Sequence, residues 1–206
     1  GKPKFDKKGI MKKGLIVIIV IAVVVLGIFM WVKGTYNGLV TKQEGVESAW
    51  SQVENVYQRR ADLVPNLVAT VKGYAAHEKE TLEGVVSARA KATQMTVDPT
   101  KLDEASLKKF QEAQGELGNA IGRLLMITEN YPELKANENF LQLQAQLEGT
   151  ENRITVERQK FNDTAKSYNT DVRKFPANTI AGMFGFERKP YFEAKEGADE
   201  APKVEF

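Results

Sequence analysis

The sequence predicts an all-α protein, with an N-terminal single transmembrane helix, a long antiparallel bundle of three main helices with coiled-coil-like packing, a short C-terminal helix and a polar tail. Residues 14–32 form an apolar run without a charged side chain. Apolar residues then recur at steps of three and four through residues 36–175, and the last third of that region carries a seven-residue repeat. We therefore expect a basic flank (1–13), an anchor (14–32), a helical bundle (36–175) and a C-terminal segment (176–206).

The apolar run has the length of a membrane span. At about 1.5 Å per residue it covers roughly 28 Å as a helix, close to the ~30 Å hydrocarbon core of a bilayer. A cleaved signal peptide is the alternative, but its apolar core is usually only about 7 to 15 residues long, and no small-x-small cleavage site follows Phe29. We expect an uncleaved anchor. Met11 resembles a natural chain start, and an added segment, an alternative start and a longer native arm are all compatible with residues 1–10.

Lysines predict the orientation of this anchor. Six of them lie in residues 1–13, whereas Lys33 alone follows the run closely. The positive-inside rule then places the short N-terminus in the cytoplasm and the helical body outside it, as a single-pass membrane protein. The same lysines explain the net charge of +2, since the remaining chain is mildly acidic. We expect a lipid bilayer as partner, and no nucleic acid.

The first bundle helix is expected to run from Leu39 past Tyr74 to Ala92, with a kink but no break at Pro65. A turn at residues 97–100 should end it. Its apolar stripe comprises Val46, Ala49, Val53, Val56, Leu63, Leu67 and Val71.

A second helix is expected to follow this turn. Thr100 and Asp103 resemble a capping box at its start, and Pro132 marks its end. Its apolar positions are Leu107, Phe110, Leu117, Ile121, Leu124 and Tyr131.

The third helix has the most regular pattern in the chain. Asn137 can cap its start and Pro176 should end it. A strict seven-residue spacing predicts a left-handed supercoil. The residues that follow this spacing are Phe140, Leu147, Ile154, Phe161, Tyr168 and Phe175.

Beyond the third helix, residues 178–186 suit one short turn or helix with an apolar patch formed by Ile180, Met183, Phe184 and Phe186. The last twenty residues are charged and lack a core pattern, so we expect a mobile tail.

No catalytic, cofactor or metal site is predicted. The chain has no cysteine and a single histidine, His77, and Thr81 stands where a zinc-protease helix would need a second histidine. No nucleophile and base pair and no glycine-rich phosphate loop stands out, so neither a small-molecule substrate nor enzymatic activity is expected.

Seven residues are candidates for an interaction or for setting helix register. A buried or interfacial ion pair that fixes register is one reading of the charged candidates, and an anion or partner contact is the other. Charges interrupt the first stripe, further charges flank Ile154 on the third helix, and two aromatic rings lie near the C-terminus. The candidates are Arg59, Arg60, Asp62, Glu151, Arg153, Phe184 and Phe186.

Several stretches resemble the LemA family. Residues 36–92 contain RRADLVPNL at Arg59 to Leu67 and KGYAAHE at Lys72 to Glu78, and YPELKANENFLQLQAQLEGTENRI, FNDTAKSYN and KFPANTIAGMFGF follow in the family's order. The resemblance covers about residues 11–192. It implies a bacterial membrane-anchored helical bundle without an established enzymatic activity, so no catalytic residue is carried over. Descriptions of the family place the N-terminus outside the cell, opposite to what the lysines predict.

Two functions remain open at this point. The first is a structural or scaffolding protein that organises membrane or partners and assembles into a homo-oligomer. The alternative is an adaptor or regulator of another membrane protein, such as a protease or a signalling kinase, that docks through its helical surface.

Overall fold

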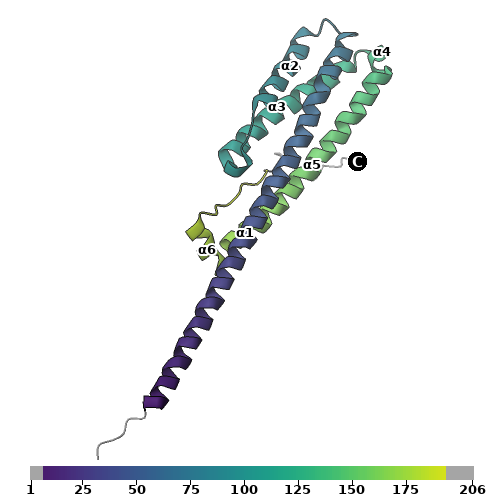
Figure 1. Ribbon diagram of the computed structural model, residues 1–206. Coiled ribbons are helices and arrows are strands. Elements are labelled where there is room, and N and C mark those ends of the chain that lie inside the picture. Colours follow the sequence, from purple (N-terminus) through teal and green to yellow (C-terminus); the bar gives the residue numbers. More distant parts are fainter. Residues whose placement is uncertain (1–6, 194–206) are drawn as a thin grey trace, which may run out of the picture.

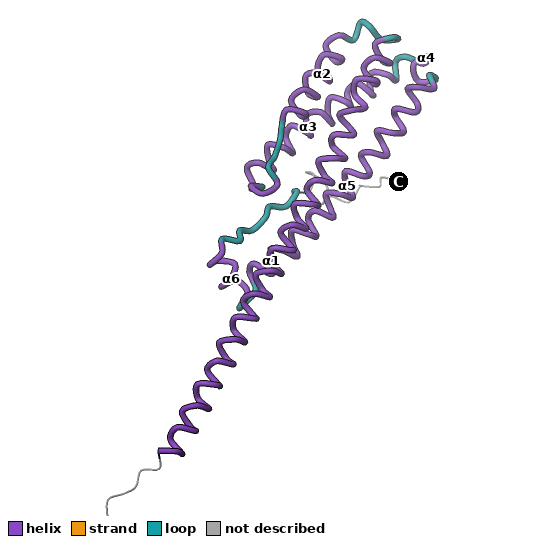
Figure 2. Tube along the Cα trace, viewed as in Figure 1, coloured by secondary structure: helices purple, strands orange, loops and turns teal. Residues whose placement is uncertain are grey.

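The computed structural model describes residues 7–193, with side chains from Lys13 onward, and every regular element in that part of the chain is a helix. The all-α class is therefore confirmed. Figures 1 and 2 show a long rod with a helical body at one end. In chain order the elements are α1 (Lys7–Lys72), α2 (Lys79–Gln94), the 3-10 helix η1 (Pro99–Lys101), α3 (Glu104–Thr128), α4 (Pro132–Lys135), α5 (Glu138–Arg173) and α6 (Ala177–Phe184).

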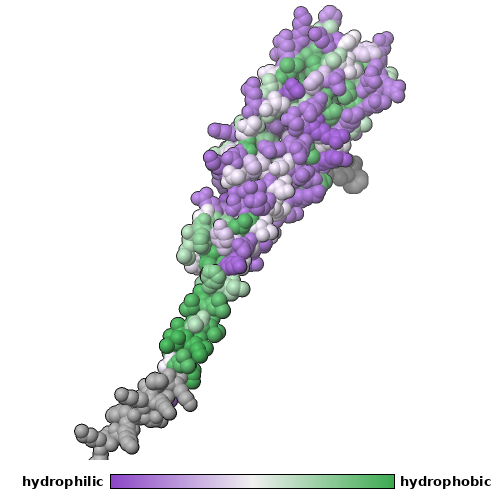
Figure 3. Space-filling view, viewed as in Figure 1, coloured by the Kyte–Doolittle hydropathy of each residue, from purple (hydrophilic) through white to green (hydrophobic). Residues whose placement is uncertain are grey.

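α1 contains the apolar run and also one side of the helical body. It has 66 residues, so it extends over about 99 Å, and it continues through Pro65 without a break, as expected. One stretch of it is long and apolar enough to cross a membrane, by length and composition. The large apolar side chains from Leu15 to Met30 are all more than half exposed. Figure 3 shows them as a hydrophobic surface that projects from the polar body.

Two helix pairs build the body. α5 lies along α1 and α3 packs on α2, which also contacts α1 (Figure 1). The α1–α5 pair is antiparallel, because Lys42 binds Asp171 at 2.5 Å near one end and Asn137 donates to the Tyr74 hydroxyl at 3.0 Å at the other. Contacts between α1 and α5 dominate the fold.

The expectation of one helix from Leu39 to Ala92 is wrong. α1 ends at Lys72, and residues 73–78 form a turn that sends α2 back along α1. Glycine at position 73 disfavours helix continuation by about 1 kcal/mol relative to alanine, and reversing the chain buries a new apolar face against α3. The buried residues of α2 are Leu82, Val85, Ala88 and Ala92.

The cap of the second long helix also differs from the expectation. Asp103, not Thr100, is the N-cap of α3, and its side chain accepts from the Ser106 backbone nitrogen at 2.7 Å while the Ser106 hydroxyl accepts from the Asp103 nitrogen. Thr100 lies one turn earlier in η1, whose cap is Asp98. Asn137 caps α5 as expected, accepting from the Phe140 nitrogen at 3.0 Å.

The seven-residue stripe of α5 is buried from Phe140 to Tyr168, as expected for core positions. Phe175 is the exception. α5 ends at Arg173, so Phe175 leaves the helical register and its side chain is 86% exposed.

The expectation of a mobile tail is wrong for residues 187–193, which we call the strap. After the left-handed turn at Gly185 (φ 73°), which favours glycine, the strap lies along α5. The Asn169 side chain donates to the Lys189 carbonyl and accepts from its nitrogen, both at 2.8 Å. Asn162 pairs in the same way with the backbone of Phe192. Residues 194–206 of the expected tail lie outside the described residues.

Candidate functional site

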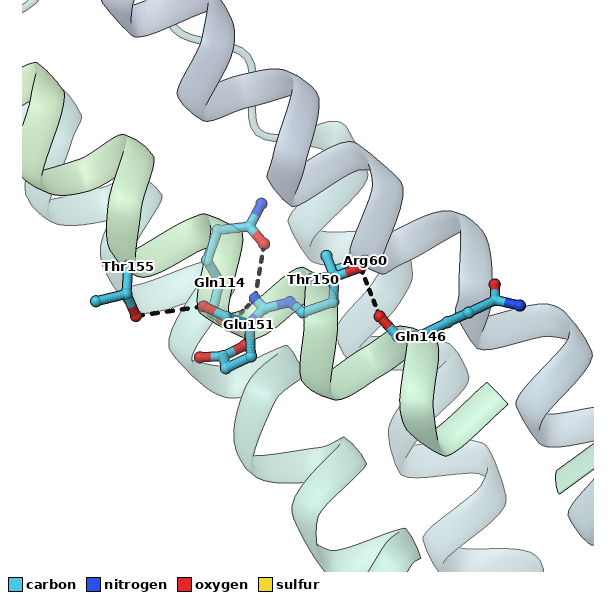
Figure 4. Close-up of polar contacts among 6 residues, drawn as sticks. All are labelled: Arg60, Gln114, Gln146, Thr150, Glu151 and Thr155. Atoms are coloured by element: carbon cyan, nitrogen blue, oxygen red, sulfur yellow. Dashed lines mark hydrogen bonds and ion pairs between the residues drawn. The ribbon is translucent and has the colours of Figure 1, made fainter. Parts of the chain in front are cut away.

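Arg60 lies where α1, α3 and α5 meet, and only 5% of it is exposed. Its Nη2 donates to the backbone oxygen of Gln114 at 2.6 Å and to the Gln114 side-chain Oε1 at 3.0 Å. Its Nη1 donates to Oε2 of Glu151 at 3.3 Å. Figure 4 shows the guanidinium between the other two side chains. We call Arg60, Gln114 and Glu151 the Arg60 node.

The Arg60 node separates two apolar cores. One lies toward the anchor and includes Trp50 and Tyr57, and the other lies toward the far end and begins at Ala61. The guanidinium carbon of Arg60 sits 5.1 Å from the centre of the Tyr57 ring. Burial raises the pKa of Tyr57, against the lowering effect of Arg158 and Arg60. The node is thus a charged layer between two apolar ones.

Glycine on α3 makes room for this buried cation. A Cβ atom at Gly118 would lie 3.3 Å from Nη1 of Arg60, tighter than an ordinary contact. Nε of Arg60 has no hydrogen-bond partner among the described residues, although it is fully buried. The hydroxyl groups beside Glu151 are satisfied within α5, since Thr150 donates to the Gln146 oxygen and Thr155 to the Glu151 oxygen (Figure 4).

The structure brings two of the charged candidates together. Arg60 and Glu151 come from two segments 91 residues apart, both of which the sequence had singled out. Asp62 is exposed and accepts from the Gln58 side chain at 2.8 Å, and Arg59 and Arg153 are exposed. A role of the node in setting helix register stays a prediction.

The aromatic candidates lie far from the node, beside the first turns of α1 after the apolar run. Phe184 and Phe186 pack edge-on against the Tyr36 ring, with centroids 4.9 and 5.5 Å away. Phe184 is 53% exposed, whereas Phe186 is half-buried.

A groove lies between α3 and α5, and the Arg60 node forms part of its wall. Its main cavity has a volume of about 780 Å³, and a second cavity of about 220 Å³ continues it along the two helices. Arg60, Gly118 and Glu151 line both cavities. Basic and acidic side chains share the walls, with Lys108 and Arg158 among the first and Glu112 among the second. We call this feature the α3–α5 groove.

Arg60 can position the groups that accept hydrogen bonds from it. A guanidinium stays protonated at any physiological pH and offers donors only, so it can hold carbonyl and carboxylate oxygens in place but cannot exchange protons. Within residues 13–193, no group of three or more His, Cys, Asp or Glu residues could hold a metal ion. His77 is exposed in the turn between α1 and α2.

Sequence reasoning missed the aromatic centre of the core near the anchor. Trp50 is fully buried, with Phe110 at 4.9 Å, Phe161 at 5.7 Å and the Phe192 ring stacked at 5.9 Å. Its position, four residues after Val46, was a signal that could have been used.

The sequence also held a signal for the strap. Asn162 and Asn169 are seven residues apart and each directly follows a core aromatic residue. A repeat of polar amides beside a buried stripe is compatible with a bound segment of backbone.

Comparison with known proteins places this architecture in a family. The magnetosome protein MamQ of Magnetospirillum gryphiswaldense is 32% identical over 80% of this chain, and MamQ 2 of Paramagnetospirillum magneticum is 30% identical over the same share. This chain covers 66% of the length of each of these relatives, slightly less than two thirds. Protein LemA of Metamycoplasma hominis is 26% identical over 84% of this chain and 76% of its own. A model of the LemA family matches residues 49–206. The chain therefore belongs to the LemA family.

Proposed function

We propose that this chain is a non-enzymatic, membrane-anchored scaffold that assembles side by side with further copies and organises the membrane around it. The observation that carries the proposal is the continuity of α1. From Lys33 to Lys72 the helix extends about 60 Å beyond the anchor. Because no loop interrupts it between the anchor and the body, the orientation of the body relative to the anchor is fixed, as a scaffold requires.

The α3–α5 groove is the surface that we assign to assembly. Gly115 and Gly122 of α3 line it, and a Cβ atom at either position would meet nothing within 4 Å. Small residues allow a helix of another copy to approach closely. The mixed charges of the walls favour a symmetric pairing, in which the same patch serves both copies.

Relatives named as magnetosome proteins support a structural role, since a scaffold is compatible with membership of a larger cellular structure. What those longer proteins assemble with is not transferred to this chain.

Cross-linking in membranes tests the assembly. The chain has no cysteine, so Asn119→Cys introduces a single thiol at an exposed position that lines the groove. With a short bismaleimide we expect a product of twice the 23.0 kDa chain mass. Ser87→Cys, on an exposed face of α2, is the control and should stay monomeric.

A second variant tests the groove itself. Gly122→Gln fills the smaller cavity and should abolish the Asn119→Cys product, whereas Gly84→Gln, at another helical glycine with open space, should not. A product of Asn119→Cys with a different polypeptide would favour the adaptor function instead. Absence of any product would overturn assembly through this groove.

We also propose that the short N-terminus faces the cytoplasm of a bacterial cell and that the body lies outside the inner membrane. The lysine asymmetry supports it. In spheroplasts, a membrane-impermeant maleimide should label Ser87→Cys without lysis. Labelling that requires lysis would reverse the orientation.

A further inference from the structure

An apolar patch lies at the end of the body nearest the anchor. α6 packs on α1 and α5 and buries Ile180 and Ala181. Large apolar side chains around it nevertheless stay open, with Phe175 86%, Met183 73% and Phe184 53% exposed. We call these three residues the α6 patch. Exposed apolar residues gathered in one corner mark a contact surface, unlike residues scattered singly.

The α6 patch has a defined height above the anchor. The Phe184 ring packs on Tyr36 at 4.9 Å, and Tyr36 follows Val32, the last residue of the apolar run, by four positions or about 6 Å. The headgroup layer on each side of a bilayer is roughly 5 to 8 Å thick. When residues 14–32 fill the hydrocarbon core, α6 therefore lies level with the headgroups.

The apolar surface continues from the anchor to the α6 patch. A cavity of about 500 Å³ lies between them, lined by Trp31, Gly34 and Leu39 of α1 and by Phe175 and Ala177. Trp31 is 42% exposed, and an indole at this level is typical of a membrane interface. Figure 3 shows hydrophobic surface extending from the anchor onto the adjoining part of the body.

Basic side chains surround the same corner. Lys33, Arg173 and Lys174 are exposed. The nearby Asp171 is bound by Lys42 at 2.5 Å and lies 3.9 Å from Lys174. The excess of positive charge suits the phosphate oxygens of lipid headgroups.

We infer that the α6 patch is a second membrane contact, in which Phe175, Met183 and Phe184 enter the interfacial layer of the bilayer that α1 crosses. Continuity with the anchor, the height of the patch and its basic surroundings all favour a lipid surface as the occupant. Because α6 lies on one side of α1, the contact restricts rotation of the rod about its axis. The inference rests on the anchor that the proposed function includes, but not on self-assembly.

Site-directed spin labelling of the full chain tests this contact. Met183→Cys carries a single nitroxide, and the protein is placed at one copy per nanodisc of phosphatidylethanolamine and phosphatidylglycerol. Power saturation compares collisions with oxygen, which concentrates in the bilayer, and with a water-soluble nickel chelate. Met126→Cys is the matched control, because this methionine is 71% exposed but lies near the C-terminal end of α3. Val24→Cys reports on the anchor.

We expect the ratio of oxygen to nickel accessibility at Met183→Cys to be several-fold above that at Met126→Cys and below that at Val24→Cys. A ratio equal to that at Met126→Cys, with Val24→Cys in the bilayer, would overturn the second contact and leave the anchor intact. Protection of Met183→Cys from both reagents would indicate a protein contact and also overturn it. An aqueous ratio at Val24→Cys would instead refute the anchor itself.

Discussion

Truncation of Arg60 should destabilise the body far more than truncation of its neighbour in sequence. Arg60→Ala removes the donors to both Gln114 oxygens and to Glu151, and it leaves a hole between the two apolar cores. Arg59→Ala removes an exposed side chain of the same type from the same turn of α1. Both variants change helix propensity and net charge in the same way, so the difference between them measures the buried interactions of Arg60.

The magnitude follows from the contacts. Two hydrogen bonds from a charged donor contribute about 1.5 to 3 kcal/mol each, while burying the guanidinium costs several kcal/mol. The side chain of Glu151 is 45% exposed, so its ion pair with Arg60 contributes at most about 1 kcal/mol to stability. We expect Arg60→Ala to lower the free energy of unfolding by about 3 kcal/mol, and Arg59→Ala by at most about 0.5 kcal/mol.

Urea unfolding in a mild detergent, followed by circular dichroism at 222 nm, measures both variants. A loss of about 3 kcal/mol corresponds to a fall in Tm of about 6 to 12 °C for a body of this size. Equal stabilities of Arg60→Ala and Arg59→Ala would refute the view that the Arg60 node holds the three helices together.

Three further changes probe the strap and the core near the anchor. Phe192→Ala should cost about 3 kcal/mol and expose Trp50, seen as a red shift of its fluorescence; an unshifted spectrum would contradict the packing. Asn169→Ala should speed hydrogen exchange across the strap and cost about 2 kcal/mol, whereas exchange in the exposed control Asn152→Ala should match the wild type. Burial, with nearby carboxylates, raises the pKa of Tyr168 from its ordinary value of 10.0 to about 12. The folded state thus favours the neutral phenol, so the contribution of Tyr168 to stability is present below pH 10 and is lost as the pH rises from 10 to 12. Tyr168→Phe has no group that ionises here, so it should become more stable relative to the wild type over that range. Denaturation curves of both proteins at pH 9 and 11 measure this difference.

Periodicity predicted most of the buried helix faces, but it did not predict where every helix ends. The positions at seven-residue spacing from Phe140 to Tyr168 are buried, and α5, which carries them, packs along α1. The same reasoning failed at Gly73 and at Phe175. In both places the apolar spacing continues although the helix ends. After Gly73 the chain reverses and α2 still buries Leu82 and Val85, whereas Phe175, beyond the end of α5, is exposed. Apolar spacing therefore does not show whether the backbone continues as a helix.

The candidate site was predictable in part. The sequence marked Arg60 and Glu151 as charges at the edge of apolar stripes, but it gave no means to pair residues 91 positions apart. Gln114, which accepts two hydrogen bonds from Arg60, carries no charge, so nothing in the sequence distinguishes it from other polar residues. The packing of the strap on α5 was not predicted for a related reason. Asn162 and Asn169 bind backbone groups of the strap, and every residue carries such groups.

The height of the α6 patch depends on tertiary structure. The sequence predicted an apolar patch near Phe184, and the distance of that patch from the anchor follows only when α5 returns the chain to Tyr36. This return brings an interfacial segment back beside the anchor, more than 140 residues later in the chain.

Native mass spectrometry of the full chain, released directly from nanodiscs or native membrane vesicles, tests the proposed scaffold most directly. The proposal predicts complexes at integral multiples of the 23.0 kDa chain mass, which Gly122→Gln reduces to single copies and Gly84→Gln leaves unchanged. Single copies of the wild-type chain, or a stoichiometric complex with a different polypeptide, would contradict self-assembly.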